Sequence, residues 1–239
     1  LYPFGYGLSY AKFEYSDFDV KENGDAISVS LDVTNVSETD SDEVVQIYFR
    51  MENPSVKRPL RQLVAFARER IEGGRTRHFE FDIKKSELRF YDVSRERFAV
   101  EQGRYTFMAG ASSEDIRLTK TIDVSGEIIP PRELCKGVKA KNYDGKCGAK
   151  MKYSKKLEQH YMLGGGLIYN NCVLGEADSI EIVCGSRVNM GKITVDVTEF
   201  ETVTAQFDKA VLAGIDREKP AVFELWMPEQ IYILGFRTY

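Results

Sequence analysis

Apolar and polar residues alternate along most of the first 125 residues. The segment 26–33 reads Ala-Ile-Ser-Val-Ser-Leu-Asp-Val, with every second side chain apolar. This period of two is typical of a β-strand that buries one face. Turn signals such as Asn23-Gly24 separate this segment from its neighbours. Further strands with the same pattern span 44–49, 76–83, 104–109 and 116–124. About seven short strands over roughly 110 residues predict an immunoglobulin-like β-sandwich.

A second strand-rich region follows a boundary segment, 125–132, which contains Gly126, Pro130 and Pro131. The double proline favours a stiff, extended connector and cannot join a central strand. The glycine run 164–166 lacks the Lys-Ser/Thr pair of a phosphate loop, so we interpret it as a turn between strands. The predicted strands of this region span 179–184, 192–197, 221–226 and 231–236. Such strands, punctuated by glycines, predict a second β-sandwich of the jelly-roll type.

The predicted fold class is therefore all-β, with two tandem β-sandwiches. The first is immunoglobulin-like or fibronectin III-like, and the second is jelly-roll-like. We expect an interdomain connector arm over 1–11, the first sandwich over 12–125, a Pro-rich linker over 126–132 and the second sandwich over 133–239.

The 239-residue chain has the composition of an ordinary globular protein, with 43% hydrophobic and 29% charged residues. This apolar content is sufficient for hydrophobic cores, and the length allows one or two domains. The formal net charge of -4 argues against nucleic acid as a partner, because nucleic-acid-binding proteins carry clustered excess Lys and Arg. No apolar run is long enough to cross a bilayer. We therefore expect neither a nucleic-acid partner nor a membrane partner.

The N-terminal run LYPFGYGLSY combines aromatic rings with Pro3, Gly5 and Gly7. Glycine permits positive φ, proline fixes φ, and the rings need apolar surface to cover them. The run therefore predicts a tight connector packed on a neighbouring domain; without that neighbour we expect a mobile arm or one packed on a crystal neighbour. It resembles the PFGYGLSYT segment of glycoside hydrolase family 3, the retaining β-glucosidases and β-xylosidases. There the segment leads from an α/β sandwich domain into a fibronectin type III-like domain, so the resemblance implies that the chain begins within a longer polypeptide.

Further spaced motifs extend this resemblance from residue 1 to about residue 125. Residues 58–68 are similar to the family's RPxxxLxxFxR strand, and a Glu-Gly-Gly turn follows at 72–74. Residues 88–92 are similar to its LxFYD signature, and residues 103–116 are similar to its GxYxxxxGxSSxDI ending.

The resemblance also implies that this chain lacks the catalytic groups. Retaining hydrolysis needs a carboxylate nucleophile and a carboxylic acid about 5 Å apart. In the family the nucleophile is an Asp on a barrel domain and the acid is a Glu on the sandwich domain, both upstream of this segment. The segments 16–18 and 77–79 are only local look-alikes of family motifs and lie in predicted strands. We therefore expect no catalytic residue, no metal and no cofactor, and no hydrolysis by this chain alone.

The second region is similar to family 6 carbohydrate-binding modules. The segment 137–143 resembles their first strand, and 164–167, 177–182 and 231–236 follow in that family's order. Sugar binding needs flat aromatic faces for a pyranose ring and amides or carboxylates for its hydroxyls. The family's Asn before the last strand and one of its aromatic residues have no counterpart here. The candidate carbohydrate-binding residues are Tyr169, Asn170, Asn171, Trp226, Gln230 and Tyr232.

A long polar loop in the first region, 51–61, supplies a second candidate site. In relatives, loops of the fibronectin-like domain pack on the catalytic domains and sometimes approach the active-site rim. The corresponding candidates for an active-site rim here are Asn53, Lys57 and Arg58. The alternative, which we favour, is that the loop only covers the sandwich domain.

The four cysteines, Cys135, Cys147, Cys172 and Cys184, all lie in the second region. Their spacing contains no CxxC pair, which argues against a zinc ribbon. Two disulfides in an exported protein and four reduced thiols in a cytosolic protein both fit. We favour reduced thiols, and we favour a bacterial cytoplasmic location slightly over a secreted or periplasmic one.

These observations predict a non-catalytic C-terminal region of a retaining family 3 β-glycosidase. Its expected partners are the barrel and α/β sandwich domains of the parent enzyme, with a β-linked oligo- or polysaccharide and a second copy of the chain as further options. One alternative is a stand-alone polysaccharide-binding module, which requires exposed rings such as Trp226 or Tyr169. The other is a purely structural or oligomerisation domain, in which those rings are buried. The choice between β-glucosidase and β-xylosidase stays open, because the deciding pocket residues belong to other domains.

Overall fold

The computed structural model describes residues 2–155, 158–186, 189–190, 193–194, 201–206, 216, 219 and 221–238. These residues form two compact units, and each is described by itself. Unit 1 comprises Leu1–Tyr91 and Arg97–Ile129, and unit 2 comprises Asp92–Glu96 and Pro130–Tyr239. The all-β fold class predicted from the alternation is confirmed, while the jelly-roll type of the second sandwich stays a prediction.

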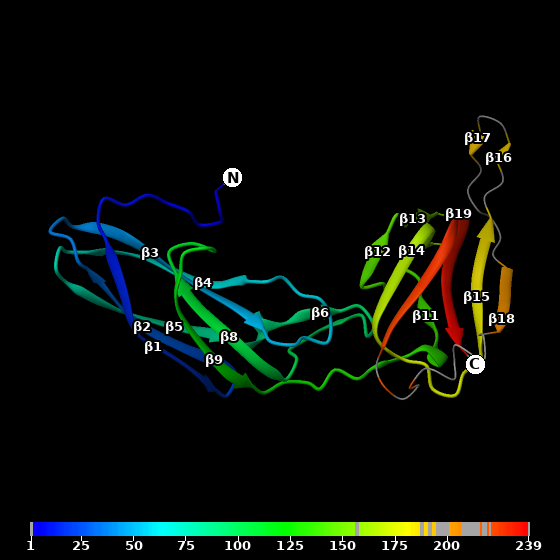
Figure 1. The fold of residues 1–239 in the computed structure, drawn as a ribbon, viewed down its shortest axis with the longest axis horizontal. Coiled ribbons are helices and arrows are strands. Elements are labelled where there is room, and N and C mark those ends of the chain that lie inside the picture. Colours follow the sequence, from blue (N-terminus) through cyan, green and yellow to red (C-terminus); the bar gives the residue numbers. More distant parts are fainter. Residues whose placement is uncertain are drawn as a thin grey trace. The chain divides into compact units, whose positions relative to one another are not determined.

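Unit 1 consists of two antiparallel sheets (Figure 1). The three-stranded sheet has the order β1-β2-β5, and the four-stranded sheet has the order β4-β3-β8-β9. The strands of the first sheet are β1 (Phe13–Asn23), β2 (Ala26–Asn35) and β5 (Thr76–Lys84). Those of the second sheet are β3 (Ser41–Met51), β4 (Gln62–Ile71), β8 (Gly103–Gly110) and β9 (Ile116–Val124). A short 3-10 helix η1 (Lys85–Leu88) and two short strands, β6 (Phe90–Asp92) and β7 (Arg97–Ala99), complete the elements before residue 129.

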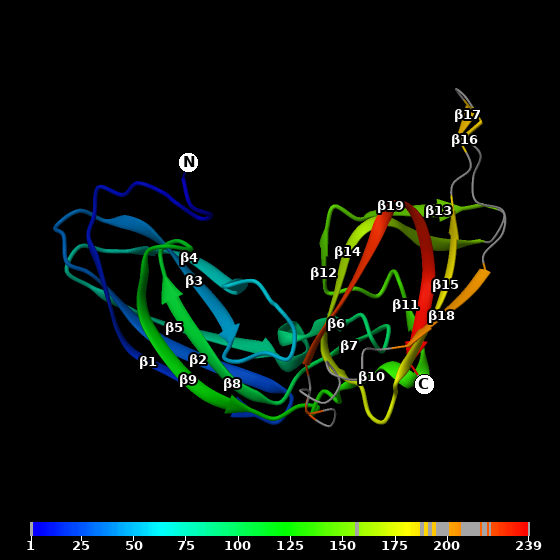
Figure 2. The same cartoon turned by 45° about the vertical axis from the view of Figure 1, so that its right-hand side comes forward.

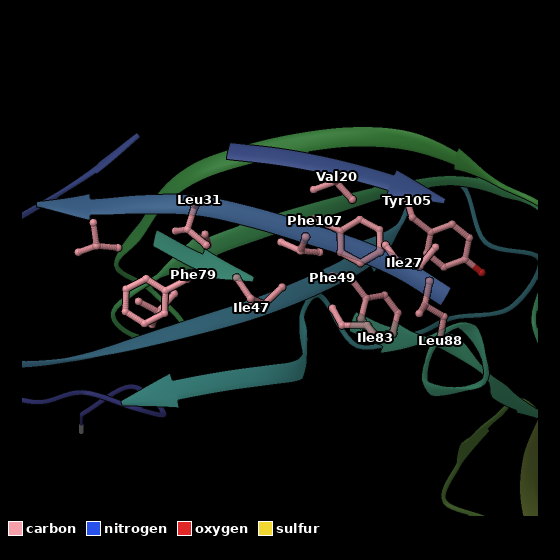
Figure 3. Packing of buried hydrophobic residues seen from close by; sticks show 14 of the residues in the cluster. Val20, Ile27, Leu31, Ile47, Phe49, Phe79, Ile83, Leu88, Tyr105 and Phe107 are labelled. Atoms are coloured by element: carbon pink, nitrogen blue, oxygen red, sulfur yellow. The ribbon is translucent and has the colours of Figure 1, made fainter. Parts of the chain in front are cut away.

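The core of unit 1 follows directly from the alternation in its strands (Figure 3). In β2 every second residue is buried, from Ile27 to Asn35. Its inward side chains, such as Leu31, meet Ile47 and Phe49 of β3 and Phe107 of β8 in one hydrophobic cluster. The five strands predicted here at 26–33, 44–49, 76–83, 104–109 and 116–124 all lie within observed strands.

Unit 2 is built on one eight-stranded sheet whose path runs β10-β14-β19-β15-β18. Figure 2 shows β14 and β19 side by side, and they pair in antiparallel fashion. Short strands β12 and β13 pair with β14, and β11 pairs with β19. The strands of this sheet are β10 (Arg132–Glu133), β11 (Val138–Lys139), β12 (Gly145–Cys147), β13 (Lys150–Ser154), β14 (Gln159–Val173), β15 (Ser179–Ser186), β18 (Glu201–Gln206) and β19 (Ala221–Thr238). A 3-10 helix η2 (Leu134–Lys136) and a separate pair, β16 (Asn189–Met190) with β17 (Ile193–Thr194), complete the described elements.

Two predictions for the second region are wrong. The glycine run 164–166 is not a turn but lies inside β14, and the two strands predicted at 221–226 and 231–236 are one strand, β19. The strand predicted at 179–184 lies within β15. Of the strand predicted at 192–197, β17 covers two residues, and the others lie outside the described residues.

The glycines of β14 form a β-bulge. Gly164 and Gly165 have positive φ angles of 53° and 71°, and the pairing with β19 shifts register between Leu163 and Gly165. Met162 and Leu167 are both fully buried although they are five positions, an odd number, apart along the strand. A regular strand would point them to opposite faces, and a bulge restores both to the core. The glycines are therefore needed within the strand, since L side chains rarely adopt such φ values.

Candidate functional site

The N-terminal arm is fastened to unit 1 through its backbone. The Tyr6 N–H donates to the Pro3 carbonyl over 3.1 Å, which closes a turn around Gly5 with φ of 76°. The side-chain amide of Gln46 donates to the Gly5 carbonyl over 3.4 Å. A Cβ at position 5 would overlap the Gln46 side chain, so this turn requires glycine. The Ser113 N–H donates to the carbonyl of Phe4 over 2.9 Å, which ties the arm to the end of β8.

The apolar side chains of the arm remain exposed although its backbone is bound. The rings of Tyr2 and Tyr6 stack on each other at 4.7 Å. Nearby, Phe66 of β4 lies opposite Gln46 of β3, so both side chains share the outer face of this sheet. We call the following residues the apolar face: Tyr2, Phe4, Tyr6, Leu60, Leu63 and Phe66, all of which are exposed.

The loop 51–61 is anchored by a buried ion pair. The Arg58 guanidinium pairs with the Glu101 carboxylate, and only 6% and 9% of the two side chains are exposed. Arg58 also lies 3.9 Å from the centre of the Phe90 ring, and Glu101 accepts the Ser55 N–H over 3.0 Å. Arg58 therefore points into unit 1, and its expected role at an active-site rim is corrected to that of an anchor.

The other two rim candidates, Asn53 and Lys57, are exposed. Asn53 lies next to a hollow of about 520 Å³ on the outer face of β3, β8 and β9. The hydroxyls of Thr106 and Thr121 are 2.8 Å apart in this hollow, and Thr106 also donates to Glu52 over 2.6 Å. We call it the arginine hollow, and it is lined by Arg50, Glu52, Asn53, Arg61, Arg104, Thr106, Met108, Ile116, Thr119 and Thr121.

The electrostatics of the arginine hollow are positive. Three guanidinium groups line it against one carboxylate, that of Glu52. The pKa of Glu52 is lowered, first by the hydrogen bond from Thr106 and second by the contact with Arg50. Glu52 therefore stays ionised at neutral pH. Arg50 lies 3.0 Å from Glu52, whereas no ion pair joins Arg104 to a carboxylate among the residues that the structure describes.

In unit 2 the structure separates the candidate sugar-binding residues. Tyr169 is fully buried, its hydroxyl donates to the Ala140 carbonyl over 3.1 Å, and its ring packs edge-on against Phe236 at 5.1 Å. Burial also raises the pKa of the Tyr169 hydroxyl. The expectation that this ring is available to a sugar is therefore corrected: alternation along β14 after the bulge places Tyr169 on the core face.

The neighbouring asparagines shape the end of β14. The Asn170 N–H donates to the buried Asp144 carboxylate over 2.6 Å, and Asn171 adopts a φ of 53° where the register with β19 shifts again. The Asn171 side chain donates to the Pro130 carbonyl over 3.4 Å. The side chains of the other two candidates, Gln230 and Tyr232, lie outside the described residues.

Trp226 is the candidate that lies on the surface. Its side chain lies opposite Gly166 of β14, and 61% of the residue is exposed. A Cβ built at Gly166 would lie 3.0 Å from three atoms of the indole, so the ring lies over the glycine. The indole N–H donates to the Glu224 carboxylate over 3.0 Å. One ring face is therefore covered by the sheet, and the exposed remainder of the indole is held in a fixed orientation.

The two segments that resemble catalytic motifs, 16–18 and 77–79, lie in strands β1 and β5 of unit 1. Asp17 has a φ of 53° at an irregularity in the pairing of β1 with β2. His78 lies on the exposed face of β5 with its Nδ1 2.5 Å from Asp32. Among the described residues no three His, Cys, Asp or Glu side chains form a group that could hold a metal ion. Over the same residues, no helix is long and apolar enough to span a membrane.

Cys135, Cys147 and Cys172 are free thiols, whereas the side chain of Cys184 lies outside the described residues. Burial raises the pKa of the Cys172 thiol to about 11. Since the thiolate is the reactive form, Cys172 is protected at neutral pH.

Comparison with known proteins places these features in context. Residues 43–113 match the family Fn3-like, the fibronectin type III-like domain. The thermostable β-glucosidase B of Acetivibrio thermocellus is 35% identical over 133 residues, which cover 54% of this chain and 18% of that protein. An exo-α-(1→6)-L-arabinopyranosidase of Bifidobacterium breve is 33% identical over 126 residues, covering 52% of this chain and 17% of that protein. The crystal structure of the Bifidobacterium adolescentis GH3 β-glucosidase aligns with a TM-score of 0.51 at 32% identity, over 54% of this chain and 19% of that one.

The chain thus contains a fibronectin type III-like domain and is homologous over about half its length to parts of such glycosidases. It spans less than a fifth of the length of each of these relatives.

Proposed function

We propose that this chain is a non-catalytic, C-terminal region of a retaining family 3 β-glycosidase, in which unit 1 supports the barrel and α/β sandwich domains. The observation that carries this proposal is the apolar face. Six apolar side chains of the arm, of β4 and of the loop before β4 are exposed on the unit that contains the fibronectin type III-like match. We infer that they form one patch, and large exposed apolar patches mark interaction sites on soluble proteins.

The arm gives the proposal its geometry. Gln46 and Ser113 hold the backbone of the arm, so the rings of Phe4 and Tyr6 are presented in a set arrangement. A pre-ordered surface loses less side-chain and backbone entropy on association than a disordered one. The retaining reaction needs two carboxyl groups about 5 Å apart, and in this proposal both belong to the catalytic domains rather than to this chain.

The proposal is tested with the isolated chain and with the full-length polypeptide that carries it. We expect the isolated chain to be inert towards aryl β-glucosides and β-xylosides, and the full-length protein to hydrolyse at least one of them with retention of configuration. Phe66→Asp should shorten the half-life of that activity at elevated temperature, because a charge would be buried against the partner. Val36→Asp, at an exposed apolar residue outside the apolar face, is the matched control. Hydrolysis by the isolated chain, or equal half-lives for the two variants, would contradict the proposal.

A second candidate function, glycan binding by unit 2, is favoured by the exposed, orientated ring of Trp226. Flat indole faces bind the apolar face of a pyranose, and the Glu224 carboxylate beside the ring can accept hydrogen bonds from sugar hydroxyls. Because the face below the ring is already occupied by Gly166, one sugar ring would stack from the solvent side.

Trp226 is also the single tryptophan of the chain, so its fluorescence reports this site alone. The test titrates the chain with xylo-, cello- and laminari-oligosaccharides while fluorescence and heat are recorded. Saturable binding that is lost in Trp226→Ala and retained in Trp226→Phe supports glycan binding. If no sugar binds and the fluorescence instead changes with protein concentration, the ring belongs to an interface between copies. The sugar that the parent enzyme cleaves does not follow from this similarity, because relatives named for different glycosides match the chain.

A further inference from the structure

The arginine hollow has a chemistry that the apolar face alone does not explain. Arg50, Arg61 and Arg104 line it, and Glu52 is the one acidic residue among its lining residues. Asp123 lies opposite Arg104 in the pairing of β8 with β9 but does not line the hollow. Two of its lining residues, Met108 and Thr106, are only 4% and 7% exposed. Guanidinium groups bind carboxylates through planar, paired hydrogen bonds. An anionic group of the carboxylate type is therefore the expected occupant.

The hollow is continuous with the apolar face. The Arg61 guanidinium donates to the Ser113 carbonyl, and the Ser113 N–H donates to the Phe4 carbonyl. Arg61 thus links the hollow to the arm, and the exposed Leu60 precedes it in the chain. A partner that covers the apolar rings also covers the rim of the hollow and removes water from it. Charges that lose their water without gaining a partner are costly, so this partner must bring compensating charge.

We propose that the arginine hollow receives one or more acidic side chains of the catalytic part of the same polypeptide, as a charged anchor beside the apolar face. This inference rests on the proposed function above. We expect an acidic occupant because the hollow is lined by arginines. We expect this occupant to be part of a polypeptide because the hollow is continuous with the apolar face. An acidic sugar is the less suitable occupant, because no residue among those lining the hollow in the described chain is aromatic.

The test compares two charge reversals in the full-length polypeptide. Arg50→Glu places a negative charge in the hollow, whereas Arg77→Glu makes the same change on β5 of the other sheet. The two arginines are matched, since each pairs with one glutamate and their side chains are 51% and 59% exposed. We expect Arg50→Glu to shorten the half-life of activity at elevated temperature about tenfold, and Arg77→Glu to leave it nearly unchanged. The melting temperature of the isolated chain should be the same for both variants.

The outcomes separate this inference from the proposed function. If Arg50→Glu behaves like Arg77→Glu while Phe66→Asp still shortens the half-life, the acidic anchor is wrong and the apolar interface stands. If Phe66→Asp also leaves the half-life unchanged, both the acidic anchor and the proposed function are wrong. Should Arg50→Glu unfold the isolated chain, the neutral change Arg104→Gln is compared with Arg77→Gln in its place. Calorimetric binding of glucuronate by the isolated chain that is lost in Arg104→Gln would overturn the inference in favour of an acidic sugar.

Discussion

Strand β2 of unit 1 and strand β14 of unit 2 place their apolar side chains in the core by different means. In unit 1, β2 alternates without interruption, and its inward residues Ile27 and Leu31 need no correction of register. In unit 2, β14 inverts its alternation at Gly164-Gly165 so that both Met162 and Leu167 reach the core. When alternation is uninterrupted, many residues together determine which face of a strand is buried. A bulge concentrates this determination in one or two glycines, which makes the second unit more sensitive to change at those positions.

The same contrast appears in the exposed surface. Unit 1 has an apolar face on the arm, β4 and the loop before β4, and it also has a hollow lined by three arginines. Aromatic and arginine side chains are enriched in protein–protein interfaces. The described residues of unit 2 include two exposed rings, Tyr153 and Trp226, and that of Trp226 is supported by Gly166. A supported ring of this kind is suited to a small ligand. The comparison therefore assigns different partner sizes to the two proposals made above.

The largest expected effect tests whether the two cores are independent. Phe107→Ala in unit 1 and Leu167→Ala in unit 2 each remove a fully buried side chain, and such changes cost about 3–5 kcal/mol for Phe and about 2–5 kcal/mol for Leu. Calorimetry of the whole chain should show two unfolding transitions, with each variant shifting a different one. A single transition that both variants shift equally would show that the units unfold as one.

A buried ion pair of unit 1 gives the next effect. Arg58→Met leaves the Glu101 carboxylate buried without its cation, which costs about 3–5 kcal/mol. The double variant Arg58→Met/Glu101→Leu should recover most of this loss, because the unpaired charge is then gone. Urea unfolding of the wild type, Arg58→Met and the double variant measures the loss of stability and its recovery. An equally unstable double variant would mean that the loop requires this pair for reasons other than charge.

The bulge of unit 2 is tested by two glycine substitutions. Gly165→Ala forces a Cβ into the backbone around Ala149 at positive φ, whereas Gly175→Ala meets open space at a similar φ of 62°. The backbone conformation alone costs about 1–2 kcal/mol, so Gly175→Ala should lose about that much and Gly165→Ala clearly more. Equal losses in urea unfolding would show that the close approach of the neighbouring strand is easily relieved.

A pH effect of the same sign is expected in both units and is the smallest. Burial raises the pKa of Glu43 from 4.5 and that of Asp144 from 3.8. The folded state therefore binds these protons more tightly than the unfolded state. The stability that each group contributes is fully present below its pKa in the unfolded chain. This stability is lost as the pH rises through the pKa of the group in the folded protein. Relative to Glu43→Gln or Asp144→Asn, the wild-type free energy of unfolding should fall as the pH rises from about 4 to 7. A difference that stays constant or grows with pH contradicts this.

The predictability of the fold differed between regions for identifiable reasons. The strand 116–124 coincides with β9, because regular alternation with one buried face is a local signal. The glycine run 164–166 was misassigned, since glycine is typical both of turns and of bulges and only cross-strand pairing distinguishes them. The single strand β19 was divided in two for a related reason: it changes partners along its length, from β14 to β15.

The candidate residues show the same limit. Tyr169 and Trp226 are both aromatic residues in strands, yet one is in the core and the other on the surface. The bulge at Gly164-Gly165 reverses which positions of β14 face inward, and the glycines that permit it fit a turn equally well. Arg58 was a candidate for an active-site rim because it lies on the long polar loop 51–61, whereas the loop folds its side chain back onto Glu101. The arginine hollow was missed, since Arg50, Arg61 and Arg104 come from separate segments.

By itself, the sequence determined the all-β class and five strands of unit 1, β2, β3, β5, β8 and β9, because these depend on local periodicity and turn chemistry. It also carried the resemblance to family 3 glycosidases, with the expectation that the catalytic carboxylates lie elsewhere. The tertiary structure alone decided which side chains are buried, which charges are paired and which apolar groups share a face. Those properties depend on pairings between residues far apart in the chain, and the free energy of each pairing is set by its neighbours in space.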